Sequence, residues 1–324
     1  MFRTILVPLD GTAFGEQALP LAMHLAARAQ AELHLVHVHA PTLIPVGLEA
    51  PPYAGAARSD LARESVRFYL ERMAAKLGQT GLAVSSALRD GPVVATIEER
   101  VRAVGAELVV LSTHGRGGLS LVWHQGVADQ LRRQLAVPLL LVPAAAEELP
   151  DGPRERPIQH VLVPLDGSAF AETVLEYVGR LCRITDAACT LLHVLPNAAA
   201  PSTVWSGAEP VDELALERRR QQAEQYLHRL AERLPLAAER VRTRIAVASE
   251  PAEAILEAAE RDGPELPRAD LLALECHVHG RLARLFGSHV AETVLQHSPV
   301  PVLVHHPSPA RGPEPVARAL AVDA

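Results

Sequence analysis

The stretch Ile5-Leu-Val-Pro-Leu-Asp-Gly-Thr-Ala-Phe14 returns later in the chain as Val161-Leu-Val-Pro-Leu-Asp-Gly-Ser-Ala-Phe170. Counted from Asp10 to Asp166, the offset between the two copies is 166 − 10 = 156 residues. A repeat of this length is a whole domain rather than a solenoid unit, whose period is about 20–50 residues. In a chain of 324 residues, it predicts one domain that has been duplicated.

The repetition continues to the far end of each half, so a site in one half has a counterpart to examine in the other. We predict domains at 1–143 and 158–306, a polar linker at 144–157 and a flexible tail at 307–324. The further matching pairs are His37-Val38 with His193-Val194 at 156 residues, and His114, Val127-Ala128 and Val137-Pro138 with His277, Val290-Ala291 and Val300-Pro301 at 163 residues.

Each half alternates strand-like and helix-like segments, which predicts an α/β fold with a parallel sheet and helices on both faces. Residues 41–57 are rich in Pro, Gly and Ala and predict a long loop. The predicted strands of the first half are 4–9, 33–38, 82–88, 108–112 and 137–142, and its helices are 14–29, 58–77, 92–104 and 127–135. The predicted strands of the second half are 160–165, 189–194, 241–247, 270–274 and 300–304.

Composition excludes several classes of protein. A net charge of −7 argues against sequence-independent nucleic-acid binding, which needs a cationic surface. The longest apolar run, 135–146, contains two prolines and is too short to span a bilayer, and no signal peptide follows Met1. The three cysteines show no CxxC spacing, which is typical of reduced thiols. We therefore expect a cytoplasmic protein without a nucleic-acid or membrane partner.

Four motifs, found in order along the chain, resemble those of the universal stress proteins. They are the strand-Pro-Leu-Asp-Gly-[ST] opening, the His-Val strand end, the Thr-His-Gly-Arg-Gly-Gly-Leu-Ser loop at 113–120 and the closing Val-Pro-[LV]-Leu strand. The resemblance covers about 2–143 and 158–306. It implies two tandem Rossmann-like domains of the adenine-nucleotide alpha hydrolase type, each with a five-stranded parallel sheet.

The same resemblance implies dimers that form through the last strand. In a tandem chain we therefore expect strands 138–142 and 300–304 to pair within one molecule, since both are apolar. Whether such chains pair again as a homodimer stays open, and no particular protein partner is indicated.

Nucleotide-binding members of the family carry a loop pattern G-x-x-G-x9-G-[ST]. Its glycines let backbone N–H groups approach phosphates, and its last pair opens a helix that favours an anion. The resemblance places ATP or AMP, with Mg²⁺, so that adenine lies beside Val38 or Val194 and the nucleoside near Asp10 or Asp166. For both aspartates, a plain turn or helix-capping role is the alternative.

The first half departs from this pattern. Its four key positions read Ser112, Gly115, Gln125 and Gly126, so that only the second glycine remains in place. Gln125 puts a side chain where backbone should meet phosphate. Gly126 can still cap the helix, but it offers no hydroxyl group.

The second half departs further. Its equivalent positions read Glu275, Val278, Ser288 and His289, so that a carboxylate faces any phosphate. A rival register exists, in which Gly280 takes the role of Gly115 and Ser288 opens the helix. Both registers stay open, because loops tolerate such shifts.

Neither a metal site nor a catalytic site is predicted. Zinc takes cysteine and histidine ligands, and Cys276, His277, His279 and His289 lie close together in the sequence. However, an extended chain would point the Cys276 side chain to the face opposite His277 and His279. The sequence contains no P-loop lysine motif and no G-x-S-x-G elbow.

The resemblance, with these departures from its loop pattern, therefore implies a non-enzymatic stress-response protein that binds or regulates others through protein contacts, with degenerate nucleotide-binding loops. The alternative is an ATP or AMP sensor with a working pocket in the first half only. A weaker alternative is slow ATP hydrolysis.

Overall fold

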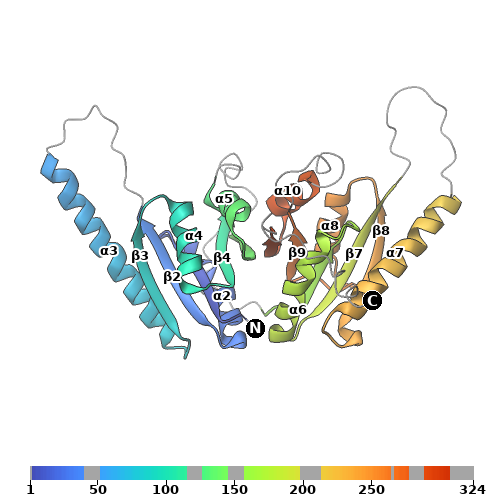
Figure 1. Cartoon of the computed structure of the whole chain (residues 1–324), viewed down its shortest axis with the longest axis horizontal. Coiled ribbons are helices and arrows are strands. Elements are labelled where there is room, and N and C mark those ends of the chain that lie inside the picture. Colours follow the sequence, from blue (N-terminus) through green and yellow to red (C-terminus); the bar gives the residue numbers. More distant parts are fainter. Residues whose placement is uncertain are drawn as a thin grey trace, which may run out of the picture.

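The computed structural model describes residues 2–39, 52–114, 126–144, 157–197, 213–263, 266–276 and 288–306. The described strands form one ten-stranded sheet in the order β3-β2-β1-β4-β5-β10-β9-β6-β7-β8 (Figure 1). Within each half, every strand pair is parallel. The predicted α/β fold class is confirmed, with the two five-stranded sheets joined into one.

The first half follows the predicted order of strands and helices. β1 is flanked by β2 and β4 and is buried on both faces, which explains its unbroken apolar run. The elements are β1 (Thr4–Pro8), α1 (Ala13–Glu16), α2 (Leu19–Ala29), β2 (Glu32–His39), α3 (Pro52–Gly78), β3 (Val84–Asp90), α4 (Val93–Val104), β4 (Leu108–His114), α5 (Val127–Gln134) and β5 (Leu139–Ala144).

The second half repeats this order. A short 3₁₀ turn, η2, replaces α1, and a second turn, η3, precedes the outer strand. The elements are β6 (His160–Pro164), η2 (Ala171–Thr173), α6 (Val174–Thr185), β7 (Ala188–Pro196), α7 (Glu213–Arg233), η3 (Ala238–Arg240), β8 (Val241–Ala248), α8 (Pro251–Glu260), β9 (Leu271–Glu275), α10 (Ser288–His297) and β10 (Val302–His305).

Two sequence predictions were wrong in detail. The helix predicted over 14–29 is two helices, because Pro20 has no N–H to continue α1 and instead occupies the first turn of α2. The loop predicted over 41–57 ends earlier, since α3 begins at Pro52. Proline is tolerated in a first helical turn, so a Pro-rich composition did not exclude a helix there.

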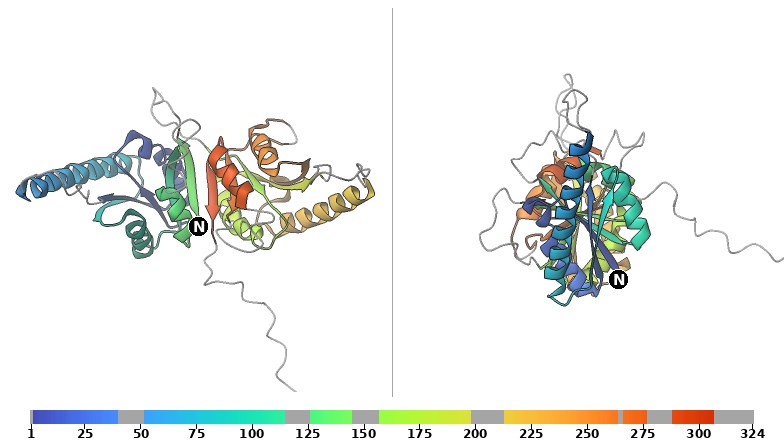
Figure 2. Two further views of the ribbon diagram at one scale, coloured as in Figure 1. Left: turned by 90° about the horizontal axis from the view of Figure 1, so that it is seen from above. Right: turned by 90° about the vertical axis from the view of Figure 1, so that its left-hand side faces the viewer.

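The two halves meet in the middle of the sheet, at a joint formed by β5 and β10. β5 and β10 pair antiparallel, with Leu140 opposite Leu303, and Figure 2 shows the two strands side by side when viewed from above. Each face of the sheet carries one apolar core that contains residues of both halves. The first core is covered by α2, α3, α6 and α7, and the second by α4, α5, α8 and α10.

Polar contacts also join the halves beside this joint. Arg28 donates from Nε to the carbonyl of Ile184 at 2.9 Å. The guanidinium group of Arg180 lies 3.7 Å from the Glu107 carboxylate and 5.3 Å from the centre of the Phe2 ring. The joint therefore combines strand pairing, a shared core and helix contacts.

A buried histidine makes the first half sensitive to acid. His34 is 2% exposed; its Nδ1 lies 2.7 Å from Ser85 Oγ, and its Nε2 accepts from Arg100 Nε at 2.8 Å. Burial, followed by the nearby Arg100 charge, lowers the pKa of His34 from 6.5 to about 4. Protonation at Nε2 would break the bond from Arg100, so the folded state resists it.

We expect this histidine to contribute stability above pH 6.5 that is lost as the pH falls towards about 4. The unfolded state binds the proton more tightly, so acid favours unfolding. After allowance for solvent screening, the loss is about 2 kcal/mol. Urea unfolding of the protein and of His34→Gln across this pH range checks it, because glutamine can accept from Arg100 without titrating. Parallel pH profiles for the two proteins would contradict it.

Candidate functional site

The first candidate residue, Asp10, follows β1 at the carboxyl edge of the sheet. Its Oδ1 accepts from the backbone N–H of Thr12 at 2.9 Å and from the Thr12 hydroxyl at 2.7 Å. Thr12 in turn caps α1, accepting from the N–H of Gly15 at 3.1 Å. Gly11 between them has a φ of +81°, which favours glycine. The carboxylate therefore holds the turn that leads into the first helix.

The second half builds the same turn. Asp166 Oδ1 accepts from the N–H and hydroxyl of Ser168 at 2.9 and 2.6 Å, and Ser168 accepts from the N–H of Ala171. Gly167 has a φ of +89°. Both aspartates are exposed, so each combines a turn role with a carboxylate that still faces solvent.

The two valines expected beside adenine lie near the carboxyl ends of the neighbouring strands β2 and β7. Val38 on β2 lies opposite Arg89 of β3, and Val194 on β7 lies opposite Ala246 of β8. Both valines are half-buried and pack against the second apolar core. They form part of the same carboxyl edge as the aspartate turns.

The first-half loop positions are only partly within the described residues. Ser112 is half-buried on β4, opposite Val142 of β5. Gly126 is the N-cap of α5, and as a glycine it has no side chain with which to cap this helix. Gly115 and Gln125 lie outside the described residues. The described part thus offers a small polar side chain and a helix start whose first amides have no side-chain cap.

The second-half site is built around Glu275, at the end of β9. The Glu275 side chain is 2% exposed. Its Oε1 accepts from the Thr173 hydroxyl and lies 2.8 Å from His305 Nδ1. Tyr177 Oη lies 3.2 Å from His305 Nε2, with the two rings 4.6 Å apart. Side chains of η2, α6 and β10 therefore gather on this one carboxyl group, which we call the Glu275 cluster.

Burial and hydrogen bonding act on the carboxyl group of the Glu275 cluster in opposite directions. Burial raises the pKa of the Glu275 carboxyl above its usual range, although the bonds with His305 and Thr173 act in the opposite direction. The second carboxylate oxygen, Oε2, is buried and has no hydrogen-bond partner among the described residues. An unpaired buried oxygen of this kind disfavours a second negative group nearby.

The sequence did not predict Thr173, Tyr177 or His305 as site residues. The offsets of 156 and 163 place Gln17, Leu21 and Val142 at the equivalent positions of the first half. The two halves therefore differ at all three positions, as they do at Ser112 and Glu275. A comparison of the halves could have marked these residues as a site specific to the second half. Ser288 begins α10, and the alternative loop residue Gly280 lies outside the described residues, as does Val278.

The metal-ligand candidates of the second half lie partly within and partly outside the described residues. Within the described ranges, no three His, Cys, Asp or Glu side chains are grouped so as to hold a metal ion. Cys276 is buried, and burial raises the pKa of its thiol to about 11. His277 and His279 lie outside those ranges.

Comparison with known proteins decides the family. A model described as the universal stress protein family matches residues 1–143 and 157–306. The chain belongs to this family. The resemblance seen in its motifs is thereby confirmed, including the tandem arrangement of two such domains.

Two curated universal stress proteins each match about half of the chain. YxiE of Bacillus subtilis is 26% identical over 148 residues, which cover 44% of this chain and 99% of that protein. MJ0531 of Methanocaldococcus jannaschii is 21% identical over 155 residues, which cover 46% of this chain and 86% of that protein. These relatives are each similar to one domain of the tandem chain.

Solved structures match the whole tandem. A universal stress protein from Archaeoglobus fulgidus superposes with a TM-score of 0.60 at 16% identity, covering 95% of this chain and 97% of that one. PA1789 from Pseudomonas aeruginosa has a TM-score of 0.58 at 17% identity, covering 94% and 93%. At these identities, the likeness shows the fold. No helix in the described part of the chain is long and apolar enough to cross a membrane.

Proposed function

We propose that this chain is a non-enzymatic stress-response protein of the cytoplasm that acts through contacts with other proteins, its nucleotide-binding loops being degenerate. The observation that carries the proposal is the Glu275 cluster. Glu275 stands where nucleotide-binding members of the family have the first glycine of the phosphate loop, and its side chain is buried and bonded to Thr173 and His305. The cytoplasmic location is supported by three cysteines that are all buried and unbridged.

Energetics support a second half that rejects nucleotides. An ionised Glu275 about 4 Å from a phosphate charge would cost roughly 4 kcal/mol at an effective dielectric near 20. That penalty corresponds to about three decades of affinity. A protonated Glu275 would remove the repulsion, but a phosphate would still have to displace the bonded cluster at the end of β9.

A second candidate function is a nucleotide sensor with its pocket in the first half, where ATP or AMP with Mg²⁺ would control partner binding. The specific observation in its favour is the start of α5. Gly126 is its N-cap and makes no side-chain hydrogen bond to it, so the first backbone N–H groups of the helix can donate to an anion. Ser112 also lacks the carboxylate of its counterpart, Glu275. Slow ATP hydrolysis is a weaker alternative, for which no residue of this chain can be named as the base that activates water.

Titration with ATP and Mg²⁺ tests the proposal. We expect no binding heat and no thermal shift at millimolar ATP. A site with a dissociation constant near 10 µM would instead add about 2.7 kcal/mol of stability at about 1 mM ATP, which thermal unfolding detects readily.

The matched variant is Ser112→Glu, which copies the second-half residue into the first half. Under the proposal, both proteins give the same flat titration. Binding that Ser112→Glu abolishes would instead establish the first-half sensor. Phosphate release measured on the same samples, with Asp10→Ala as a control, decides the hydrolysis alternative.

A further inference from the structure

The two ends of the sheet carry the same kind of groove. β3 and β8 are the outer strands of the ten-stranded sheet, and α3 and α7 flank them (Figure 1). The groove beside β8 and α7 has a volume of about 700 Å³, and the one beside β3 and α3 has about 290 Å³. Both lie far from the joint between the halves, and neither includes a candidate nucleotide residue.

The larger groove follows the edge of β8 itself. It is lined by the consecutive residues 242–245 of this strand. Side chains at successive strand positions point to opposite faces of a sheet, so a groove that touches all four runs along the strand edge. Leu227 of α7 and Ile245 provide its apolar part. No described strand pairs with this edge of β8, which leaves its backbone available for pairing.

Both grooves are basic in a chain whose net charge is −7. The β8 groove has three arginines and one glutamate, a formal charge of 3 − 1 = +2. The β3 groove has four arginines and one glutamate, a formal charge of 4 − 1 = +3. The charged residues are Arg220, Arg242, Arg244 and Glu224 in the first case, and Arg63, Arg67, Arg89, Arg100 and Glu71 in the second.

Different positions supply the strand arginines in the two halves. Arg242 lies opposite Thr190 of β7. The repeat offset of 156 residues takes Thr190 to His34 of β2, and the residue opposite His34 is Ser85. By the same comparison of strand partners, Ala87 of β3 is the counterpart of Arg244 of β8. The β3 groove instead obtains its charge from residues such as Arg89 and Arg100. The basic character is therefore more than a copy of one ancestral set of residues.

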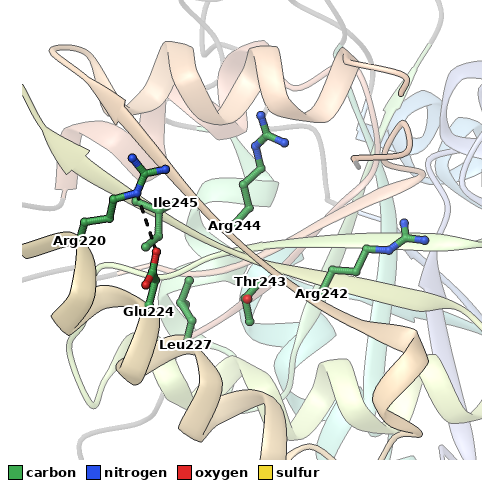
Figure 3. Close-up of a pocket in the computed structure, with 7 residues that line it drawn as sticks. All are labelled: Arg220, Glu224, Leu227, Arg242, Thr243, Arg244 and Ile245. Carbon is green, nitrogen blue, oxygen red and sulfur yellow. Dashed lines mark ion pairs between the residues drawn. The ribbon is translucent and has the colours of Figure 1, made fainter. Parts of the chain in front are cut away.

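The arrangement of the arginines in the β8 groove suits an extended ligand better than a small anion. Figure 3 shows the guanidinium groups of Arg220, Arg242 and Arg244 spread apart rather than converging on one point. Arg220 lies 3.8 Å from Glu224. Arg242 and Arg244 are two residues apart on one strand, a spacing of about 6.6–6.8 Å. Acidic side chains at alternate positions of a partner strand have the same spacing.

We infer that the β8 edge binds an extended acidic segment of a partner protein, which adds a strand beside β8 and sets its carboxylates against Arg242 and Arg244. Backbone pairing would supply affinity, and the arginines would select for acidic side chains. The inference rests on the proposed action through protein contacts, and it names the surface and the partner's chemistry. The β3 edge, with its smaller groove, is expected to bind the same class of segment more weakly.

Fluorescence anisotropy with a labelled peptide tests the inference. The probe has eight residues, the length of β8, with glutamate alternating with threonine and valine. Saturable binding to the full chain is expected. The double variant Arg242→Glu/Arg244→Glu should weaken it by about tenfold or more, because both charge pairs become repulsive. The matched control is Arg219→Glu/Arg229→Glu, which makes the same charge change on α7 outside the groove and should alter binding by less than about twofold.

A second probe separates strand addition from simple charge attraction. The same peptide with alternate backbone nitrogens methylated keeps its charge but loses its pairing groups, and we expect it to bind about tenfold more weakly or worse. Equal binding of both peptides, equal effects of the two double variants, or no saturable binding would each overturn the inference. So would tighter binding of inorganic tripolyphosphate with the same dependence on Arg242 and Arg244. The ATP titration is unaffected by these outcomes, so the two proposals can fail separately.

Discussion

Replacing Leu303 with glutamate is expected to destabilise the protein by about 4 kcal/mol or more and to open the joint between its halves. Leu303 and its partner Leu140 are both 0% exposed, and they face each other across the antiparallel pair β5 and β10. Both belong to the apolar core that runs through the two halves. A carboxylate at this position would have no partner and no water. Urea unfolding gives the loss of stability, and small-angle scattering shows whether the halves separate.

Two further variants isolate the charge at the joint. Leu303→Ala removes the side chain without adding a charge, and it is expected to cost about 3 kcal/mol with the joint still closed. Val247→Glu introduces the same carboxylate on β8, at a position that is 44% exposed, and should change stability by less than about 0.5 kcal/mol. Equal shifts of the urea midpoint for Leu303→Glu and Val247→Glu would show that the joint does not depend on this contact.

The fold was largely predictable because its signals are local. A strand buried on both faces must be apolar throughout, so the runs at β1 and β6 are visible in the sequence. The start of α3 was not predictable from composition, since proline and alanine occur both in loops and in first helical turns. The joining of the two sheets into one also has no local signal, and its expectation came from the resemblance.

The candidate site was less predictable because its contacts are tertiary. The aspartate turns follow from the Asp-Gly-[ST] sequence, which contains every group they use. The Glu275 cluster brings together Thr173 and Glu275, 102 residues apart, and Tyr177 and His305, 128 residues apart. No spacing rule connects such residues. Only the difference between the two halves at these positions marks them in the sequence.

Replacing Arg132 with leucine is expected to cost about 3–5 kcal/mol, because it breaks a buried ion pair and leaves a carboxylate without its buried partner. The Arg132 and Asp129 side chains are 9% and 6% exposed, and they lie 2.5 Å apart on α5. Burial works against the charge of Arg132, but contacts with Cys276 of the second half and with Asp129 outweigh it and raise its pKa. The guanidinium group thus ties α5 to the end of β9 as well as to its own helix.

Arg133 limits the loss of stability that Arg132→Leu causes. Its guanidinium lies 2.9 Å from Asp129 and is 40% exposed, so the carboxylate keeps one solvated partner and the cost should fall near the lower limit. The control is Arg102→Leu, which breaks the exposed pair with Glu98 on α4 and should cost less than about 0.5 kcal/mol. Adding Asp129→Ala to Arg132→Leu should recover part of the loss, since it removes the stranded charge. Urea unfolding of the four proteins measures these differences, and similar losses for Arg132→Leu and Arg102→Leu would mean that burial adds nothing to this pair.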